Sequence, residues 1–158
     1  MRAYADSSFI LRLVLKEADS GQVIAEYRRI GKPPIFFLPL HTLEVRNAIL
    51  QRAFHQRRSV ASDERQHVAR ERDAAFRRLE HLIIRRTLLD ATIDMDTSIL
   101  RATQLSAVHT GKLGLRAIDL LHVASALILE AKLFLTTDVR QGQLARAEGL
   151  KVVSTALA

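Results

Sequence analysis

The chain alternates short apolar runs with longer stretches in which apolar residues recur at helical spacing. Continuous apolar and aromatic character, as in IFFL, is typical of strands that are buried on both faces of a sheet. The segments that predict strands are RAYA at 2–5, IFFL at 35–38, part of LLDATIDM at 88–95, LFLTT at 133–137 and KVVS at 151–154.

Helical spacing of apolar residues predicts helices between these strands. The predicted helices cover 7–17, 22–31, 40–54, a long stretch from Ser62 or Asp63 to about Leu88, 97–111, 118–131 and 139–149. Glycines mark several of their expected ends, at Gly31, Gly111, Gly114 and Gly149. The helix at 118–131 is hydrophobic nearly all round, so we expect it to lie in the interior.

The order of the predicted elements is strand, helices, strand, helices, strand, helix, strand. This order favours a single α/β domain with a mainly parallel sheet that helices cover on both faces. A length of 158 residues suits one domain of ordinary size. The high share of predicted helix leaves an all-α fold as the main alternative.

Composition excludes several classes of site. The chain has no cysteine, which rules out a disulfide scaffold, thiolate metal sites and cysteine nucleophiles. The N-terminal segment MRAYADSSFI lacks the basic-then-apolar pattern of a secretion signal. No apolar stretch approaches the length of about 18 residues that a membrane span needs. We therefore expect a cytoplasmic protein with no membrane partner.

Positive charge is concentrated in one part of the chain. Between Arg52 and Arg86 there are ten arginines and five acidic residues, so this stretch carries +5 of the formal net charge of +7. A concentration of this kind suggests a polyanionic partner, most simply a nucleic acid. The alternative is a solvated helix face with ion pairs, such as Asp73 with Arg77 at helical spacing.

Four carboxylates occupy comparable places in the predicted fold. Asp6 and Asp138 each follow a strand directly, Asp119 lies in the first turn of the buried helix, and Glu44 lies one turn into the helix after IFFL. Taken singly, each acid has a simpler explanation, because aspartate is a preferred helix N-cap and first-turn acids favour the helix dipole. Taken together, they fall at the carboxyl edge of a parallel sheet, where α/β proteins bind ligands.

Several carboxylates at one edge would need a compensating positive charge. Two unit charges 4 Å apart repel by about 4 kcal/mol at an effective dielectric of 20. A divalent cation is the simplest compensation, and oxygen ligands favour Mg²⁺ or Mn²⁺. Such ions catalyse in-line displacement at phosphate, and arginines hold a nucleic-acid backbone, so the combination suits phosphodiester hydrolysis.

At these residues the sequence resembles PIN-domain ribonucleases of the VapC-like type, which act as toxins in toxin–antitoxin pairs. The matching motifs are AYADSSFIL, LPLHTLEVRNAI, LRAIDLLHVASALIL and FLTTDVRQGQLARAEGLKVV, in the order and spacing of the family. The resemblance covers essentially the whole chain. It implies a PIN-like three-layer sandwich with a central sheet of about four to five strands. The arginine-rich helical segment at about 55–88 lies between the second and third motifs.

The resemblance also implies roles for individual residues. Asp6, Asp119 and Asp138 would help to hold Mg²⁺ or Mn²⁺, and Glu44 would complete the site and orient or deprotonate the attacking water. Ser8 and Thr137 fall where small hydroxyls could bind water or phosphate. Gln141 stands where some relatives have a further acid, which weakens a second metal position. The expected activity is a metal-dependent endoribonuclease, with RNA as substrate, a cognate antitoxin protein as inhibitor and a homodimer as the assembly.

Other interpretations of the same residues stay open. His122 and His41 lie three residues from Asp119 and Glu44, but neither pair matches the Glu-x-x-His motif of di-iron bundles. We expect His122 to be a satisfied core histidine or to orient a ligand carboxylate. The competing functions are a nucleic-acid-binding module without chemistry, which uses the basic helix, and an interaction protein whose acids are helix caps.

Overall fold

A five-stranded parallel sheet forms the centre of the protein. The structure, a computed structural model, describes residues 2–155. The strands are β1 (Ala3–Ala5), β2 (Ile35–Phe37), β3 (Leu88–Asp90), β4 (Leu133–Thr136) and β5 (Lys151–Ser154), in the spatial order β3-β2-β1-β4-β5. Each predicted strand is present, and every pair of neighbours is parallel. The prediction of an α/β fold is confirmed, and the all-α alternative is wrong.

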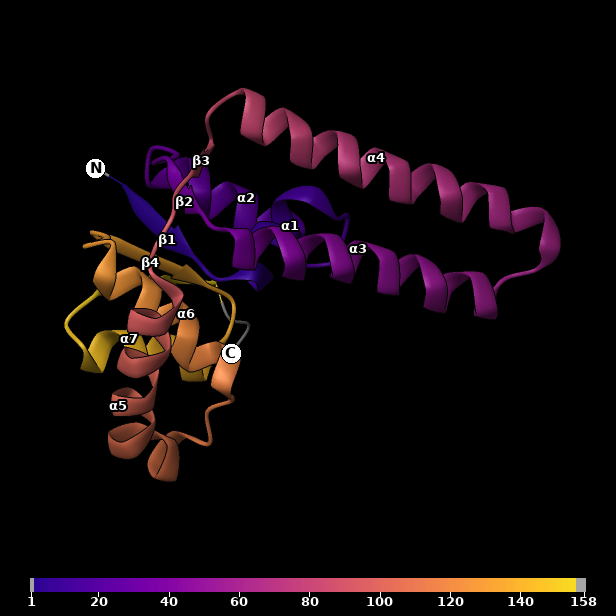
Figure 1. The fold of residues 1–158 in the computed structure, drawn as a ribbon. Helices are drawn as coiled ribbons and strands as arrows, with labels where there is room; N and C mark the ends of the chain where they lie inside the picture. The colour runs from indigo at the N-terminus through magenta and orange to yellow at the C-terminus, as the bar shows by residue number, and fades with distance from the viewer. Residues whose placement is uncertain (1, 156–158) are drawn as a thin grey trace.

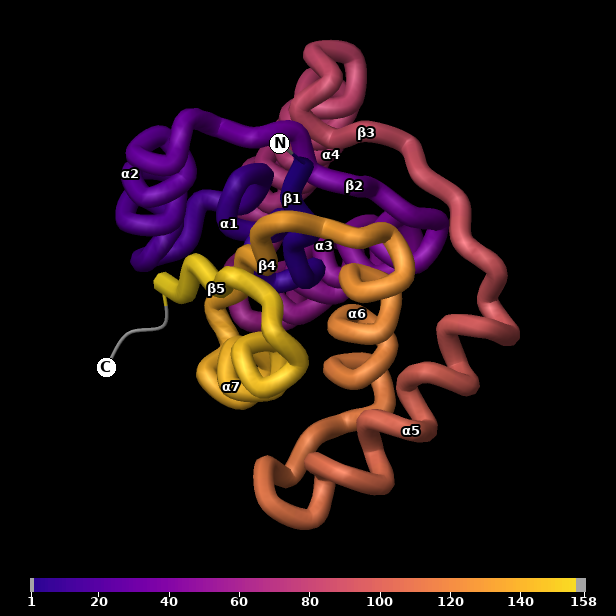
Figure 2. The backbone as a smooth tube through the Cα atoms, turned by 90° about the vertical axis from the view of Figure 1, so that its left-hand side faces the viewer, coloured from indigo at the N-terminus to yellow at the C-terminus, as the bar shows by residue number. Residues whose placement is uncertain are grey.

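Helices cover both faces of this sheet and make the protein a three-layer structure (Figure 1). The helices α1 (Ser7–Val14), α2 (Ser20–Arg29), α3 (Pro39–Ser59) and α4 (Arg65–Ile84) pack on one face. The helices α5 (Met95–Leu113), α6 (Ala117–Ile128) and α7 (Val139–Ala147) pack on the other. Figure 2 gives the same arrangement from the side, with α5 to α7 gathered together.

The strands divide their side chains between the two cores by simple alternation. In the central strand, Ala3 and Ala5 face the core under α1 to α4, while Tyr4 faces the core under α5 to α7. The neighbouring strand β4 repeats this pattern with Leu133 and Phe134. Side chains alternate between the faces of a strand, so a sheet covered on both faces needs apolar residues at consecutive positions. This requirement explains why the strand segments are continuous apolar runs.

Helices α3 and α4 form a long hairpin whose far end projects beyond the sheet (Figure 1). A short 3₁₀ turn, η1 (Ser62–Glu64), connects the two helices. The predicted helix from Ser62 or Asp63 to about Leu88 is therefore too long at both ends. Its C-terminal part turns at Arg86, which adopts a positive φ of 57°, and Leu88 already belongs to β3. The arginine-rich segment at about 55–88 comprises the end of α3, η1, α4 and the start of β3.

Several further predicted helix boundaries are wrong. Helix α1 ends at Val14 rather than at 17, α2 begins at Ser20 rather than at 22, and α3 continues to Ser59 rather than ending at 54. Helix α5 continues through Gly111 and ends at Leu113, where Gly114 caps it in the left-handed conformation with φ 62°. A glycine inside a helix is tolerated, whereas the left-handed cap favours the residue without a Cβ. Helix α6 ends at Ile128, because Glu130 adopts a positive φ of 51° before the chain enters β4. No helix within residues 2–155 has the length and apolarity to cross a bilayer.

The strand order creates a natural binding position beside the central strand. The chain runs from β1 outward through β2 and β3, then returns to the other side of β1 with β4 and β5. The direction of winding thus reverses between β1 and β4. In open α/β sheets, ligands bind outside the carboxyl ends of the strands at such a reversal. The residues that follow β1 and β4 are therefore the first place to look for a site.

Candidate functional site

Three of the four predicted carboxylates line one cavity at this position. The cavity, called the acid pocket from here on, has a volume of about 270 Å³. Asp6 follows β1, Glu44 lies in the second turn of α3 and Asp119 lies in the first turn of α6. The lining residues are Asp6, Ser7, Ser8, Leu11, Glu44, Asn47, Ala48, Gln51, Arg116, Ile118, Asp119, His122 and Gln141. Segments that are far apart in the sequence thus supply the acids.

Asp6 is almost completely buried, with 1% of its surface exposed. Its Oδ1 accepts hydrogen bonds from the Phe9 backbone N–H at 2.8 Å and the Ser8 hydroxyl at 2.7 Å. Its Oδ2 accepts one from the Thr136 hydroxyl at 2.6 Å. Burial raises the pKa of Asp6 above its usual value, although these hydrogen bonds and the nearby His122 act in the opposite direction. The ionised form of Asp6 is therefore disfavoured by its burial, and an added positive charge would stabilise it.

Glu44 is held by a chain of hydrogen bonds that leads into the core. Its Oε2 accepts from Ser7 Oγ at 2.7 Å and lies 2.7 Å from His122 Nε2. The Tyr4 hydroxyl lies 2.8 Å from the other ring nitrogen of His122. Because a carboxylate accepts only, Nε2 carries the proton towards Glu44 and Nδ1 accepts from Tyr4 when the ring is neutral. Burial alone would raise the pKa of Glu44, but the hydrogen bond and charge of His122 outweigh it, and the pKa is lowered.

Asp119 is fully buried and is paired with Arg116, the N-cap residue of its helix. The Arg116 guanidinium forms two hydrogen bonds to it, Nε to Oδ2 at 3.1 Å and Nη2 to Oδ1 at 3.0 Å. The Arg116 backbone N–H also donates to Oδ2 at 3.0 Å, and Gln141 Nε2 donates to Oδ1 at 3.0 Å. The Arg116 side chain is 67% exposed, so the guanidinium reaches the buried carboxylate from the solvent side.

Asp138 caps α7 and does not line the acid pocket directly. Its Oδ1 accepts from the backbone N–H groups of Arg140 at 2.8 Å and Gln141 at 3.0 Å. Its own N–H donates to the Thr136 hydroxyl at 2.9 Å, and that hydroxyl donates to Asp6. The hydrogen bonds and charge of Asp119, together with the charges of Asp138 and Glu44, raise the pKa of Arg116. Asp138 thus belongs to the same electrostatic group as the pocket acids.

The acid pocket has the donor chemistry that a hard divalent cation requires. Carboxylate oxygens are the preferred ligands of Mg²⁺ and Mn²⁺. Within residues 2–155, Glu44 Oε1 and Asp138 Oδ2 accept no hydrogen bond. Gln141 Oε1 in the pocket wall is buried and has no donor among these residues, and a cation or its hydrating water would satisfy it.

The carboxylates of the acid pocket do not converge on one point as the ligands of a metal ion do. Among the described residues, no group of three or more His, Asp or Glu side chains is arranged to hold a metal ion. The guanidinium of Arg116 instead provides the positive charge, through Asp119. A cation bound to Asp119 would take the place of that guanidinium. The residues therefore fit the ion by their chemistry, and the Arg116 guanidinium holds both oxygens of Asp119 in this structure.

Helix capping explains part of this arrangement but not its burial. Asp6 and Asp138 cap α1 and α7 through their side chains, and Asp119 bonds back to the N-terminus of α6. A cap needs no burial, because an N-cap aspartate keeps its hydrogen bonds when it is exposed to water. Asp6 and Asp119 are nevertheless buried, which costs free energy for an ionised group. Capping and membership of the acid pocket thus coexist in the same residues.

The supporting residues are partly those that the sequence suggested. Ser8 Oγ lies 2.7 Å from Thr137 Oγ1, so these two hydroxyls meet beside Asp6. His122 is buried and both of its ring nitrogens are hydrogen-bonded, to Glu44 and Tyr4, which confirms the prediction of a satisfied core histidine. His41 is also buried, and it accepts from the Leu38 N–H at 2.9 Å.

Sequence analysis missed Tyr4, Ser7, Thr136 and Arg116. Arg116 carries a usable signal, because it stands three residues before Asp119 at a helix start, within reach of an ion pair. Tyr4 and Thr136 sit inside short strands, where side-chain spacing alone gives no sign of a partner.

The comparison with models of protein families and the comparison with curated proteins each find no match to this chain.

Proposed function

We propose that the protein is a metal-dependent endoribonuclease with a PIN-like fold. The observation that carries this proposal is the acid pocket itself. Carboxylates from three separate segments line it at the reversal of the sheet, and two of them are buried. Nearly complete burial of two ionised acids costs free energy, and acids held in such environments are typical of functional sites. The ordered set of four motifs that resembles PIN-domain ribonucleases supports the same conclusion.

The carboxylates of Asp6, Glu44, Asp119 and Asp138 would hold a Mg²⁺ or Mn²⁺ ion, which when bound supplies an activated water and neutralises phosphate charge. The oxygen-rich donor set and the orphaned Gln141 Oε1 support this choice of ion. Gln141 is an amide where a further acid would strengthen a second site. The proposal is therefore for a single metal position.

Glu44 orients the attacking water. Ser7 and His122 hold Oε2, so Oε1 is the oxygen that can accept a hydrogen bond from water. The lowered pKa keeps Glu44 ionised at neutral pH. A carboxylate with a lowered pKa is a weak general base, so positioning is the larger part of its contribution. Tyr4 and His122 fix the side chain in place from behind.

Arg116 holds the phosphate of the RNA. Its exposed guanidinium already forms two hydrogen bonds with a carboxylate, and the same planar pair of donors suits a phosphate. When a cation takes over the charge of Asp119, the guanidinium is released towards the substrate. Arg116 thus exchanges one anion for another at the mouth of the pocket.

The biological role follows from the family resemblance. A ribonuclease of this type endangers its own cell, so we include in the proposal a toxin role with a cognate antitoxin protein as inhibitor. A homodimer is part of the same proposal, and exposed apolar residues on α5 such as Ile99, Leu100 and Val108 offer surface for it. Light scattering of the purified chain, alone and with the product of a neighbouring small reading frame, tests both partners.

Cleavage of a labelled single-stranded RNA tests the activity. The assay compares Mg²⁺, Mn²⁺ and EDTA, and compares the natural chain with Asp6→Asn and Asp119→Asn. We expect fragments with either ion, none in EDTA, and cleavage by the variants that is slower by about 10²-fold or more. Asp63→Asn is the matched control, because Asp63 is exposed on η1 away from the pocket. Fragments of equal yield from the natural chain and both pocket variants would contradict the proposal.

The second candidate is a nucleic-acid-binding module without chemistry. The concentration of arginines on the α3–α4 hairpin favours it. A pure binder would retain RNA in EDTA and in the Asn variants and would release no fragments under any condition. The cleavage assay therefore separates the two functions directly.

A further inference from the structure

A second cavity lies beside the α3–α4 hairpin, in the half next to η1, and its volume is about 480 Å³. Four arginines line it, and no acidic residue does. The name arginine pocket is used here for this cavity, which is lined by Arg57, Arg58, Arg65 and Arg72 around Leu50 and Phe54. It shares no lining residue with the acid pocket.

Three of these arginines have no side-chain hydrogen bond or ion pair within residues 2–155. Arg57, Arg58 and Arg65 are exposed, and none of them forms an ion pair within residues 2–155. Arg72 is paired with the adjacent Asp73 at 2.7 Å. Exposed guanidinium groups keep their hydration and need no partner within the protein. Three of them around one cavity are therefore available to an anionic ligand.

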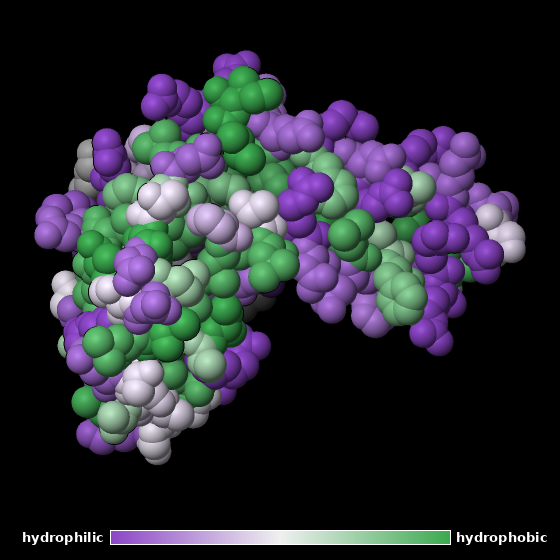
Figure 3. Space-filling model, in the orientation of Figure 1, coloured by the Kyte–Doolittle hydropathy of each residue, from purple (hydrophilic) through white to green (hydrophobic). Residues whose placement is uncertain are grey.

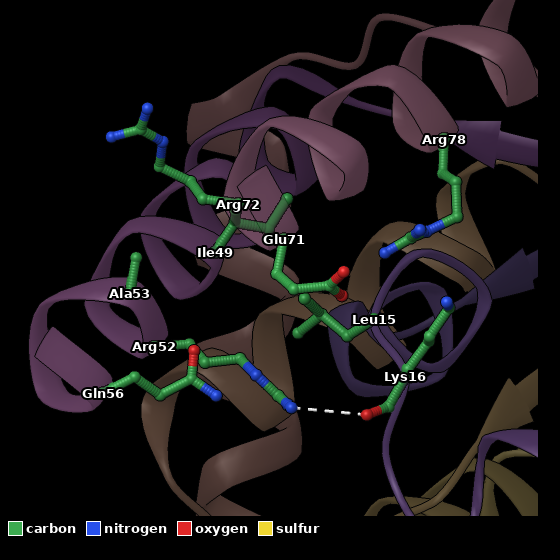
Figure 4. A pocket seen from close by; sticks show the side chains of 9 residues that line it. All are labelled: Leu15, Lys16, Ile49, Arg52, Ala53, Gln56, Glu71, Arg72 and Arg78. Carbon is green, nitrogen blue, oxygen red and sulfur yellow. Dashed lines mark hydrogen bonds between the residues drawn. The ribbon is translucent and has the colours of Figure 1, made fainter. Parts of the chain in front are cut away.

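A neighbouring cavity on the same hairpin shows what structural arginines look like (Figure 4). There Arg52 donates to Glu17 at 2.8 Å and to the Lys16 carbonyl oxygen at 3.3 Å. Arg78 donates to the Val14 carbonyl oxygen at 2.5 Å. These contacts fasten the base of the hairpin to the end of α1. Within residues 2–155, Arg57, Arg58 and Arg65 make no such contact, so their guanidinium groups are free to bind a ligand.

We propose that the arginine pocket binds a segment of single-stranded RNA at a distance from the acid pocket. The arginines would contact phosphates, for which the planar guanidinium is well suited. Phe54 would stack with one base, since its side chain is 55% exposed and Arg58 already lies 5.5 Å from its ring centroid. The apolar floor spans Leu50 to Phe54, a single helical turn of about 6 Å, which is enough for one base.

The size of the apolar floor argues against a protein partner in this pocket. A docked amphipathic helix needs apolar contacts that continue over two or more turns. Figure 3 shows the projecting hairpin as mostly hydrophilic, with small and interrupted apolar areas. The charge and shape together favour a nucleic-acid strand. The choice of RNA rather than DNA rests on the proposed function, whereas binding itself is independent of catalysis.

The test measures binding of a fluorescein-labelled single-stranded RNA of about 12 nucleotides, within the usual site size, in EDTA. The variants are Arg57→Gln/Arg58→Gln/Arg65→Gln and Phe54→Leu. The control, Arg70→Gln/Arg77→Gln/Arg85→Gln, removes the same charge from exposed arginines on or just after α4 that do not line the pocket. Asp6→Asn is included to separate binding from catalysis.

We expect the pocket triple variant to lower the slope of log affinity against log salt by about 2, which corresponds to three lost phosphate contacts. Phe54→Leu should weaken binding about fivefold or more. The control triple variant and Asp6→Asn should bind like the natural chain. Binding with this profile but without cleavage would contradict the nuclease proposal and leave this inference intact.

Two results would overturn the inference. Equal losses in the pocket and control triple variants would show that net charge alone attracts RNA. Poly-glutamate that competes as well as RNA and depends equally on Phe54 would assign the pocket to an acidic peptide. Circular dichroism melts confirm that each variant is folded before its affinity is compared.

Discussion

The acid pocket and the arginine pocket treat charge in opposite ways. In the acid pocket, Asp6 and Asp119 are buried and all their oxygens accept hydrogen bonds from protein donors. In the arginine pocket, Arg57, Arg58 and Arg65 are exposed and have no ion pair within residues 2–155. The side chains of the acid pocket are held in place by the protein, whereas the guanidinium groups of the arginine pocket contact the solvent or a ligand.

The difference follows from the cost of desolvation. A buried charge without partners costs several kcal/mol, so the fold must provide donors for each buried carboxylate. An exposed guanidinium keeps its water and needs no partner. Catalysis gains from preorganised groups, while binding of a flexible strand tolerates mobile ones. The two pockets therefore suit chemistry and capture respectively.

The largest expected effect comes from removing a buried carboxylate charge. Asp119→Asn and Asp6→Asn should each lower the rate of RNA cleavage by about 10²–10³-fold or more, because a preorganised charge at the reacting centre is lost. Single-turnover cleavage of a labelled RNA measures the effect. Wild-type rates of cleavage in both variants would contradict the assignment of catalysis to the acid pocket.

Divalent ions should stabilise the acid pocket and leave the arginine pocket unchanged. At about 100 times the dissociation constant, Mg²⁺ should raise the free energy of unfolding by about 2.7 kcal/mol in the natural chain. Asp6→Asn should lose this gain. Its stability in EDTA at pH 7 should at least equal that of the natural chain, because the raised pKa of Asp6 marks an ionised form that the fold disfavours.

Urea denaturation with and without Mg²⁺ measures these differences. The advantage of Asp6→Asn in EDTA should shrink as the pH falls, since Asp6 of the natural chain becomes protonated below its raised pKa. The pocket triple variant of the arginines serves as the control and should respond to Mg²⁺ like the natural chain. A gain with Mg²⁺ that is the same in Asp6→Asn would count against the metal position.

The hydrogen-bond chain behind Glu44 should matter less than the carboxylates. Tyr4→Phe removes the hydroxyl that holds His122 Nδ1 but keeps the ring that stacks on Phe134. We expect cleavage to fall about 10–100-fold, as for other residues that orient a ligand from behind. Binding of RNA in EDTA should not change. A loss of binding equal to the loss of rate would mean that Tyr4 has a structural role only.

His41 should make stability depend on pH. Burial, with the charge of His122, lowers the pKa of His41 to about 3. Its neutral ring accepts from the Leu38 N–H and lies 2.8 Å from the Ala5 carbonyl oxygen, so a second ring proton would face a donor. Below about pH 6.5 the His41 ring binds a proton in the unfolded chain but stays neutral in the folded chain. Stability should therefore fall, by up to about 1.4 kcal/mol per pH unit, towards pH 3.

Denaturant titrations between pH 7 and pH 4 measure this slope. His41→Gln offers both a donor and an acceptor but does not titrate, so its slope should be shallower than that of the natural chain. An identical slope in the variant would assign the acid sensitivity to other groups.

The smallest effect is expected at the exposed arginines. Arg77→Gln and Arg85→Gln should each change the free energy of unfolding by less than about 0.5 kcal/mol, because neither side chain forms an ion pair within residues 2–155. The predicted pair of Asp73 with Arg77 is wrong, since Asp73 binds Arg72 instead. Thermal melts at low and high salt measure the effect.

Much of the fold was predictable from the sequence because strands that are buried on both faces consist of continuous apolar runs. IFFL and LFLTT mark β2 and β4 for this reason. Helix ends were less predictable, because Gly111 continues a helix while Gly114 ends one. Local sequence does not state which glycine must adopt a positive φ. That choice depends on where the chain has to turn towards its next element.

The sequence by itself determined the α/β class, the parallel strands and the carboxylates that follow them, because these depend on local periodicity and on the order of elements. The tertiary structure alone decided which side chains touch. It joined Tyr4 to His122 and, through His122, to Glu44, and it set Gln141 on Asp119. It also folded the basic stretch into a hairpin with its own cavity. Contacts between segments depend on the packing of the whole chain, which no single stretch of sequence specifies.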